Sequence, residues 1–225
     1  MHIEVGVVEG AKMVLSYGTA AAVLGYTASQ VMNTVKQQGL FSLVARVFLA
    51  SIAVLMFFEV LPHHPVGVSE VHLILGSTLF LLFGAVPAAI GLALGLLAQG
   101  IFFAPFDMPN YTVNVTTLLV PLFAMSMIAK KIIPSNVAYK DLAYSQVLKL
   151  SLMYQGGIVA WVVFWALYGQ GFGAENLVAV STFGAAYMLV VLIEPIVDLA
   201  VLAGAKTINQ LSNSRSVNSR LYHSA

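Results

Sequence analysis

Cysteine is absent from this chain of 225 residues, and charged residues make up only 8% of it. Without thiols the chain can form neither a disulfide framework nor a thiolate metal site, and it has no cysteine nucleophile. The scarcity of charge, together with 60% hydrophobic residues, leaves too little polar surface for a water-soluble fold. Composition therefore indicates a polytopic membrane protein, in which any bound metal has nitrogen or oxygen ligands.

Apolar stretches separated by proline, glycine and charge predict about seven membrane-spanning helices in a single domain, residues 1–225. The alternating pattern of β-strands is missing, which argues against a barrel and favours an all-α helix bundle. The stretch from Val71 to Phe103 is too long for one span, so we expect it to turn between Gly84 and Pro87. The other predicted spans are residues 11–33, 43–61, 114–129, 146–168 and 177–204.

Basic residues are distributed unevenly over the predicted spans. Nine of the ten Lys and Arg fall on one side, and only Lys12 falls on the other. Because cytoplasmic loops are enriched in basic residues, this predicts a cytoplasmic carboxyl terminus and an external amino terminus. We expect residues 1–10 to be an external segment, retained because it carries Glu4 and Glu9 instead of the basic residues of a signal peptide. Residues 206–225 are expected to form a solvated cytoplasmic tail.

Four of the five histidines, His2, His63, His64 and His72, fall on the predicted external side. The terminal amine, the backbone nitrogen of residue 2 and the imidazole of His2 can close two fused chelate rings on Ni(II), Cu(II) or Co(II), and another imidazole would complete a square-planar site. His72 opens a predicted span, where its side chain can point into the bundle. His63 and His64 are more simply explained as hydrogen-bonded loop residues. A nearby acid such as Glu70 could orient imidazoles or attract cations, or could be a solvated interface charge.

Short motifs in roughly the first 125 residues resemble those of a known family. They are Met1-His2-Ile3 followed by Gly6, Val68-Ser69-Glu70-Val71-His72 followed by Gly76-Ser77-Thr78 and Phe83-Gly84, and Gln99-Gly100-Ile101-Phe102-Phe103 followed by Asn114. In these motifs the chain is similar to the CbiM/NikM family, the substrate-capture components of energy-coupling-factor (ECF) cobalt and nickel transporters.

The resemblance implies a centre for Co(II) or Ni(II), with cobalt for cobalamin synthesis favoured. Its ligands would be the terminal amine of Met1, the backbone and side-chain nitrogens of His2, and the imidazole of His72. Asn114 matches the family's loop asparagine, and we expect it to brace the amino-terminal segment by hydrogen bonding. Residues expected to lie next to the ligands or to admit the ion are His63, His64 and Glu70. The pair His63 and His64 is a departure from the family pattern.

The resemblance also implies a transport component of a prokaryotic inner (plasma) membrane, not an enzyme. The chain has no Gly-x-x-x-x-Gly-Lys-Ser/Thr loop, so ATP hydrolysis would come from partners. Those partners are an ECF transmembrane coupling protein and ATP-binding-cassette subunits, with or without a small accessory membrane subunit. No cofactor besides the transported ion, and no nucleic acid, is expected.

Two other classes of function stay open. A self-sufficient secondary divalent-metal permease would place acids or histidines along a pathway in mid-membrane. Only Glu194 and Asp198, in the last predicted span, fit that description, and Lys149, Arg46 or a basic groove on a coupling subunit could pair with them. A haem-binding electron-transfer protein would place histidines opposite each other within helices, whereas His2, His63 and His64 lie outside the predicted spans.

Overall fold

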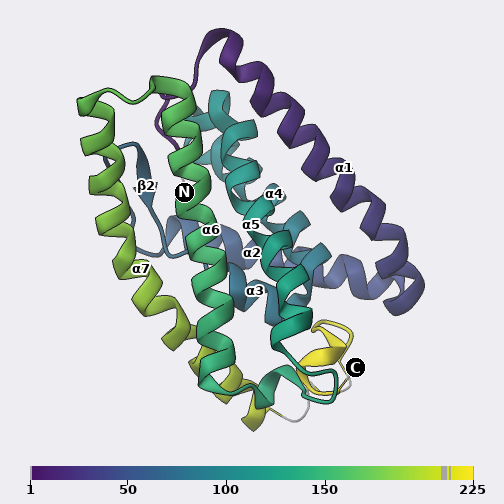
Figure 1. Ribbon diagram of the computed structural model, residues 1–225. Coiled ribbons are helices and arrows are strands. Elements are labelled where there is room, and N and C mark those ends of the chain that lie inside the picture. Colours follow the sequence, from purple (N-terminus) through teal and green to yellow (C-terminus); the bar gives the residue numbers. More distant parts are fainter. Residues whose placement is uncertain (1, 209–211, 213, 225) are drawn as a thin grey trace.

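The computed structural model describes residues 2–208, 212 and 214–224, and within them the chain forms seven α-helices and one short β-hairpin (Figure 1). This confirms the all-α polytopic bundle predicted from the sequence. The helices are α1 (Met13–Gln38), α2 (Leu40–Glu59), α3 (Gly76–Phe83), α4 (Ala85–Phe102), α5 (Tyr111–Ile132), α6 (Tyr144–Gln170) and α7 (Ala174–Thr207), and the strands are β1 (His64–Val66) and β2 (Ser69–Val71).

Five of the described helices are long and apolar enough to cross a membrane. They are α2, α4, α6, α7, and α5 together with the 3-10 turn before it, residues Pro105–Ile132. Helix α1 has 26 residues but is not apolar enough to be among them. Helix α3 has 8 residues, a length of roughly 12 Å at 1.5 Å per residue, so it is too short to span a membrane.

The prediction of two full spans within residues 71–103 was therefore wrong for the first of them. The turn itself is where the sequence placed it, since Gly84 adopts a φ of 87° between α3 and α4. Helix α3 is short because it begins only at Gly76. Residues Ser69 to Val71 pair as strand β2 with β1, and Leu75 takes a left-handed φ of 56° immediately before the first helical residue, a conformation that an α-helix does not continue through.

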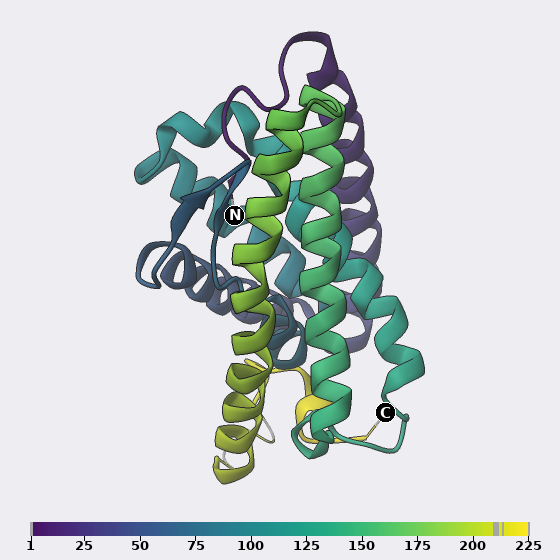
Figure 2. The same ribbon diagram turned by 60° about the vertical axis from the view of Figure 1, so that its left-hand side comes forward.

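Helices α1 and α7 form opposite flanks of the bundle, with α5 and α6 between them (Figures 1 and 2). Helix α2 packs closely on α4 because two glycines of α4 leave room for it. A Cβ atom at Gly91 would lie 2.5 Å from the Cβ of Ala50, and one at Gly95 would lie 2.5 Å from Val54. Small residues that let two backbones approach are typical of helix contacts in membranes.

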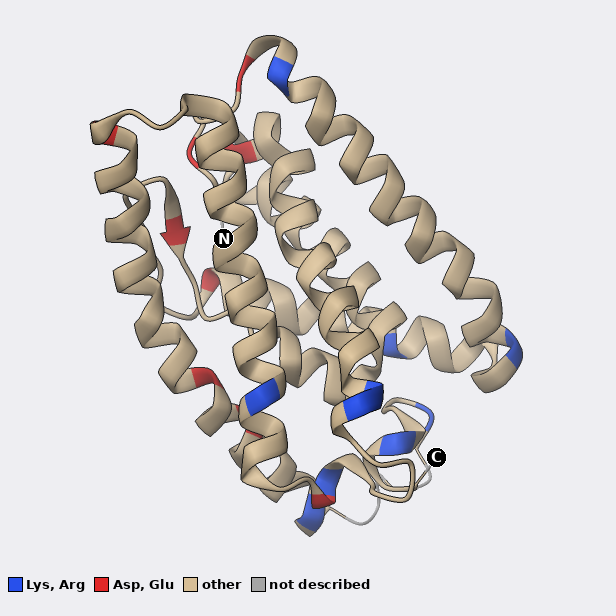
Figure 3. Ribbon diagram, in the orientation of Figure 1, with Lys and Arg blue, Asp and Glu red and all other residues tan. Residues whose placement is uncertain are grey.

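Charge is segregated along the bundle. Figure 3 shows Lys and Arg gathered in the half that contains the carboxyl terminus, with a single basic turn at the opposite end, where α1 begins. Lys12 lies at that end, directly before α1, and its amino group donates a hydrogen bond to the carbonyl of Gly169 at the end of α6, at 2.6 Å. The uneven distribution expected from the sequence is thus present in three dimensions, while the side of the membrane that each end faces stays a prediction.

Part of the carboxyl-terminal segment is packed against the bundle, so the prediction of a solvated tail was wrong for Asn218, Leu221 and Tyr222, which are buried. The hydroxyl of Tyr222 lies within hydrogen-bond distance of the carbonyls of Ala205 and Ile208, at 2.9 and 3.0 Å. The backbone N–H of Asn218 donates to the carbonyl of Leu82 at the end of α3, at 2.6 Å. Burial of the apolar Leu221 and Tyr222 side chains holds this segment in place. Residues 209–211, 213 and 225 lie outside the described residues.

The guanidinium of Arg46 is buried at the same end of α3. It donates hydrogen bonds to the carbonyl of Phe83 at 2.8 Å, to the carbonyl of Ser42 at 3.2 Å, and to the side chain of Gln38. A cation at the carboxyl end of a helix stabilises the unpaired carbonyls there. Arg46 therefore caps α3 and forms no ion pair with Glu194 or Asp198.

Candidate metal centre

Residues 2–4, which we call the amino-terminal strand, lie beside β2 of the hairpin and pair with it through one isolated bridge. Ile3 forms an antiparallel bridge with Ser69 of β2. The N–H of Glu70 donates to the carbonyl of His2 at 2.9 Å, and the Ser69 hydroxyl donates to the same carbonyl at 3.0 Å. In both views the purple segment that leads to the N label lies beside β2, well away from the turn where α1 begins (Figures 1 and 2). His2 and Ile3 are buried, so they are inserted into the molecule and do not project from its surface.

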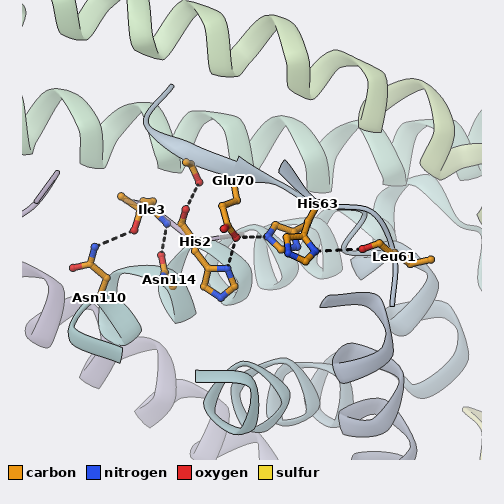
Figure 4. A network of polar contacts seen from close by, with 9 residues as sticks. His2, Ile3, Leu61, His63, Glu70, Asn110 and Asn114 are labelled. Carbon is orange, nitrogen blue, oxygen red and sulfur yellow. Dashed lines mark hydrogen bonds and ion pairs between the residues drawn. The ribbon is translucent and has the colours of Figure 1, made fainter. Parts of the chain in front are cut away.

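Two buried asparagines bind the other side of this strand (Figure 4). The side-chain oxygen of Asn114 accepts a hydrogen bond from the N–H of Ile3 at 2.9 Å. The side-chain amide of Asn110 donates to the carbonyls of Ile3 and Glu4, both at 3.0 Å. An asparagine offers both a donor and an acceptor, so it can bind backbone groups as a neighbouring strand would. The amino-terminal strand is thereby fixed between β2 and the start of α5.

The imidazoles of His2 and His72 meet at one carboxylate. His2 Nδ1 lies 2.8 Å from Oε2 of Glu70, and His72 Nε2 lies 2.7 Å from the same oxygen (Figure 4). One candidate ligand atom from each of the three residues can be chosen so that all lie within 4.8 Å of one another. His2 is 2% exposed and His72 is 1% exposed. Three groups with metal-ligand chemistry are thus collected in a buried space.

The protons at this centre can be assigned from its contacts. An ionised carboxylate only accepts hydrogen bonds, so each imidazole donates an N–H to Glu70. Burial lowers the pKa of His72 to about 3, so its ring is neutral near pH 7. Burial opposes ionisation of Glu70, but the hydrogen bonds from His2 and His72 outweigh it and hold the pKa of this carboxyl below its ordinary value. An anionic group between two imidazoles attracts a cation.

Further acids surround the same space. Burial raises the pKa of Glu4, and repulsion from Glu70 and Asp107 raises it further. The carboxyl groups of Glu4, Glu70 and Asp107 are therefore close enough to repel one another. Their combined field favours divalent cations near the amino-terminal strand.

Aromatic rings hold the two imidazoles in position. The ring of Phe58 meets both edge-on, with centroids 5.9 Å from His2 and 5.5 Å from His72. The exposed His63 stacks on His72, with ring centroids 4.9 Å apart and planes 5° apart. Phe58 is fully buried and excludes water from the inner side of the rings, whereas His63 covers the outer side.

The remaining space beside His2 is small. A cavity of about 10 Å³ lies there, room for about one water molecule. Gly100 permits close packing at its edge, because a Cβ atom at that position would lie 2.4 Å from the sulfur of Met108. The other residues lining the cavity are Leu96, Asp107, Tyr111 and Asn114. A hydrated ion would have to lose most of its water to fit beside the imidazoles.

The structure thus brings His2, His72 and Glu70 together and places Asn114 against the backbone of Ile3. Met1, the remaining ligand expected from the sequence, lies outside the described residues. His64 is exposed at the start of β1. Sequence reasoning missed contributions from Phe58, Ser69 and Asn110. Phe58 lies in a uniformly apolar run and the two polar residues in turns or short strands, so none of them carried a recognisable spacing.

Comparison with known proteins gives one family. The family described as "cobalt uptake substrate-specific transmembrane region" matches residues 2–210. No match to a curated protein or to a solved structure was found. The family match extends far beyond the 125 residues that carry the motifs and includes α6 and α7.

Proposed function

Since this chain belongs to the CbiM family of cobalt uptake transmembrane components, we propose that it captures Co(II) in the buried centre of His2, His72 and Glu70. The observation that supports this most strongly is the convergence of two imidazoles on a single carboxylate oxygen. The nitrogen of His2 that faces the carboxylate is Nδ1. That nitrogen closes a six-membered chelate ring with the backbone nitrogen of its own residue, and the terminal amine of Met1 adds a five-membered ring.

Binding exchanges protons for the metal ion. Each imidazole moves its hydrogen from the nitrogen that faces Glu70 to its other ring nitrogen, so the ring stays neutral and offers the ion a lone pair. The backbone nitrogen of His2 must lose its proton to become a ligand, so uptake releases protons into solution. The carboxylate of Glu70 then lies against the ion and compensates its charge.

We include the Glu70 carboxylate among the ligands of the proposed centre, because its oxygen contacts both imidazoles. A planar set of nitrogens is the geometry preferred by Ni(II) and Cu(II). A carboxylate oxygen added to that set as a further ligand favours an ion that does not require square-planar coordination. We therefore propose Co(II) as the transported ion.

Transport requires a source of energy that this chain does not contain. The sequence has no nucleotide-binding loop, and family membership supports an ECF-type assembly, with a transmembrane coupling protein and ATP-binding-cassette subunits, in a prokaryotic plasma membrane. In that assembly this chain would bind the ion from outside and hold it until the coupling protein opens the centre inward.

The proposal is tested by Co(II) binding to the purified protein in lipid nanodiscs. An extension of six residues before Met1 separates the terminal amine from His2. We expect this variant and His72→Gln each to lose affinity by at least about 100-fold, since even partners that only orient a ligand contribute 10–100-fold. His64→Gln, which changes an exposed histidine of the same hairpin, serves as control and should bind like the unmodified protein. Undiminished binding by His72→Gln would refute the centre.

A further inference from the structure

A second polar cluster lies in the interior, between α3, α6 and α7. On α7 it contains Glu194 and Asp198, which are 0% and 1% exposed. The hydroxyl of Ser77 on α3 lies 2.7 Å from Oε1 of Glu194 and 2.6 Å from Oδ2 of Asp198. The Thr78 hydroxyl donates to the other oxygen of Asp198. Asp198 is nine residues before the end of α7 at Thr207, a depth of roughly 14 Å along the helix.

Within the described residues no Lys, Arg or His lies within ion-pair distance of either acid, because the three ion pairs found there involve other groups. The two basic residues considered from the sequence are not available to them. Arg46 caps α3, and Lys149 is exposed. Two carboxyl groups are therefore buried in a membrane-spanning helix without a cation, an arrangement that is costly and typical of functional sites.

The contacts of Ser77 show that this cluster carries exchangeable protons. One hydroxyl has one hydrogen, so it can donate to only one of the two carboxylates. The second short contact requires a proton on Glu194 or Asp198, which then donates to the oxygen of Ser77. At least one carboxyl group is therefore protonated, and a cation could replace that proton without leaving the cluster more highly charged than before.

Helix α6, which packs on α3 and α7, carries further buried polar atoms without partners. Ser151, Tyr154 and Gln155 follow the spacing of three and four residues that places side chains on one helix face. Each is 0% exposed, and each has a polar atom with no hydrogen-bond partner in the described part of the chain. Such buried atoms are rare in proteins and indicate bound water or an ion. Oε2 of Glu194 is likewise buried and has no hydrogen-bond partner among the described residues.

Tyr154 connects this face to the acids. Its hydroxyl lies 2.6 Å from the position that a Cβ atom at Gly76 would occupy, and Gly76 directly precedes Ser77. Because Gly76 has no side chain, the Tyr154 hydroxyl, which has no hydrogen-bond partner in the described part of the chain, can approach the first turn of α3. Ser77 and Thr78 of that turn contact the two carboxyl groups of α7.

We propose that Glu194, Asp198, Ser77 and Tyr154 form a second cation site, which binds a divalent metal ion through oxygen atoms in exchange for carboxyl protons. The inference rests on the proposed function, because the ion would be the one captured at His2 and His72. Ser77 follows His72 by five residues, at most about 17 Å of chain. Oxygen ligands suit Co(II) less well than imidazole does, so this site binds the ion more weakly and passes it on.

The test uses the full chain in nanodiscs, with Co(II) alone as the probe and equilibrium dialysis as the measurement. His72→Gln weakens the first centre, so we expect this variant to keep one weak Co(II) and to release protons into a lightly buffered solution as it binds. Adding Glu194→Gln and Asp198→Asn should abolish that binding. Adding Glu175→Gln instead, an exposed acid at the start of the same helix, should leave it intact.

The outcomes separate this inference from the proposed function. If the unmodified protein binds one tight ion and His72→Gln binds none, the second site is refuted and the first centre stands. Weak binding that survives the loss of both acids also refutes it. If the unmodified protein and His72→Gln bind with the same affinity, the proposed function fails. Should the triple variant not fold, Tyr154→Phe in the His72→Gln background removes only an unpartnered hydroxyl. We expect about tenfold weaker binding, or about 1.4 kcal/mol, and unchanged affinity would overturn the proposed site.

Discussion

At the scale of single residues, the centre is arranged before any ion arrives. One oxygen of Glu70 binds both imidazoles, and Phe58 contacts both rings. The strand that carries His2 is itself held by hydrogen bonds from both sides. Ligands fixed in this way lose little conformational entropy on binding, so the residues that orient them affect affinity without touching the ion.

Asn114 offers a direct test of this arrangement. Asn114→Ala leaves the buried N–H of Ile3 without its acceptor, which costs about 1–3 kcal/mol. If that energy is lost from the bound state, Co(II) affinity should fall by about 5- to 150-fold. Asn33→Ala, at an exposed position of α1, is the matched control. Equal affinities for the two variants would show that the strand needs no support from α5.

The buried state of His72 predicts a pH dependence of stability for the metal-free protein. The pKa of His72 is about 3, whereas that of histidine in an unfolded chain is about 6.5. Between these values the unfolded chain binds a proton here and the folded protein does not, so the free energy of unfolding falls as the pH is lowered. Glu70, with its lowered pKa, adds a loss only below about pH 4.3.

Melting temperatures measured between pH 7 and pH 5 should therefore decrease for the unmodified protein. The decrease should be smaller for His72→Gln, while His223→Gln, which changes an exposed histidine, should follow the unmodified protein. Parallel curves for all three would contradict a neutral, buried His72.

At the scale of elements, short α3 joins the metal centre to the rest of the bundle. Its first turn carries Ser77 and Thr78, and its last carbonyls accept hydrogen bonds from Arg46 and from the backbone of Asn218. The Gly84 turn could be predicted, because a proline and a glycine interrupt a long apolar run. The late start of α3 could not, because Leu75 is forced into a left-handed conformation by contacts that the apolar pattern does not reveal.

Arg46 is predicted to stabilise α3 by capping it. Arg46→Met keeps much of the side-chain volume but removes the charged donor from the carbonyl of Phe83, and hydrogen bonds to charged groups contribute about 1.5–3 kcal/mol each. We expect Arg46→Met to lower the melting temperature. Lys149→Met, which removes an exposed charge, should leave the melting temperature unchanged. A melting temperature unaffected by Arg46→Met would mean that the carboxyl-terminal segment alone holds α3.

At the scale of the whole molecule, basic residues mark one end of the bundle (Figure 3). The prediction that this end is cytoplasmic can be tested cleanly because the chain has no cysteine. In intact cells, Glu9→Cys should react with a membrane-impermeant maleimide, and Lys131→Cys should react only after the cells are permeabilised. The opposite pattern would reverse the proposed direction of transport.

Whether a feature could be predicted from the sequence depended on how far apart in the chain the interacting residues lie. Histidines near the amino terminus and before α3 could be singled out because their chemistry is local, and their encounter across 70 residues was expected from the resemblance. The hydrogen bond between Asn114 and the amino-terminal segment was expected from the resemblance. The pairing of residues 2–4 with Ser69 and Asn110 was not foreseen, because these partners come from distant segments. Nor could the sequence show that Glu194 and Asp198 share the hydroxyl of Ser77 and have no basic partner.

The position of the amino-terminal strand also determines when the molecule can be completed. Ile3 binds Asn114, and the carbonyl of Val7 packs where Gly169 has no side chain, at 1.8 Å from the position of a Cβ atom there. This segment therefore has no complete place to bind until the end of α6 has been made. During synthesis residues 2–8 have to wait for residues more than 150 positions later, and the metal centre is among the late parts of the bundle to form.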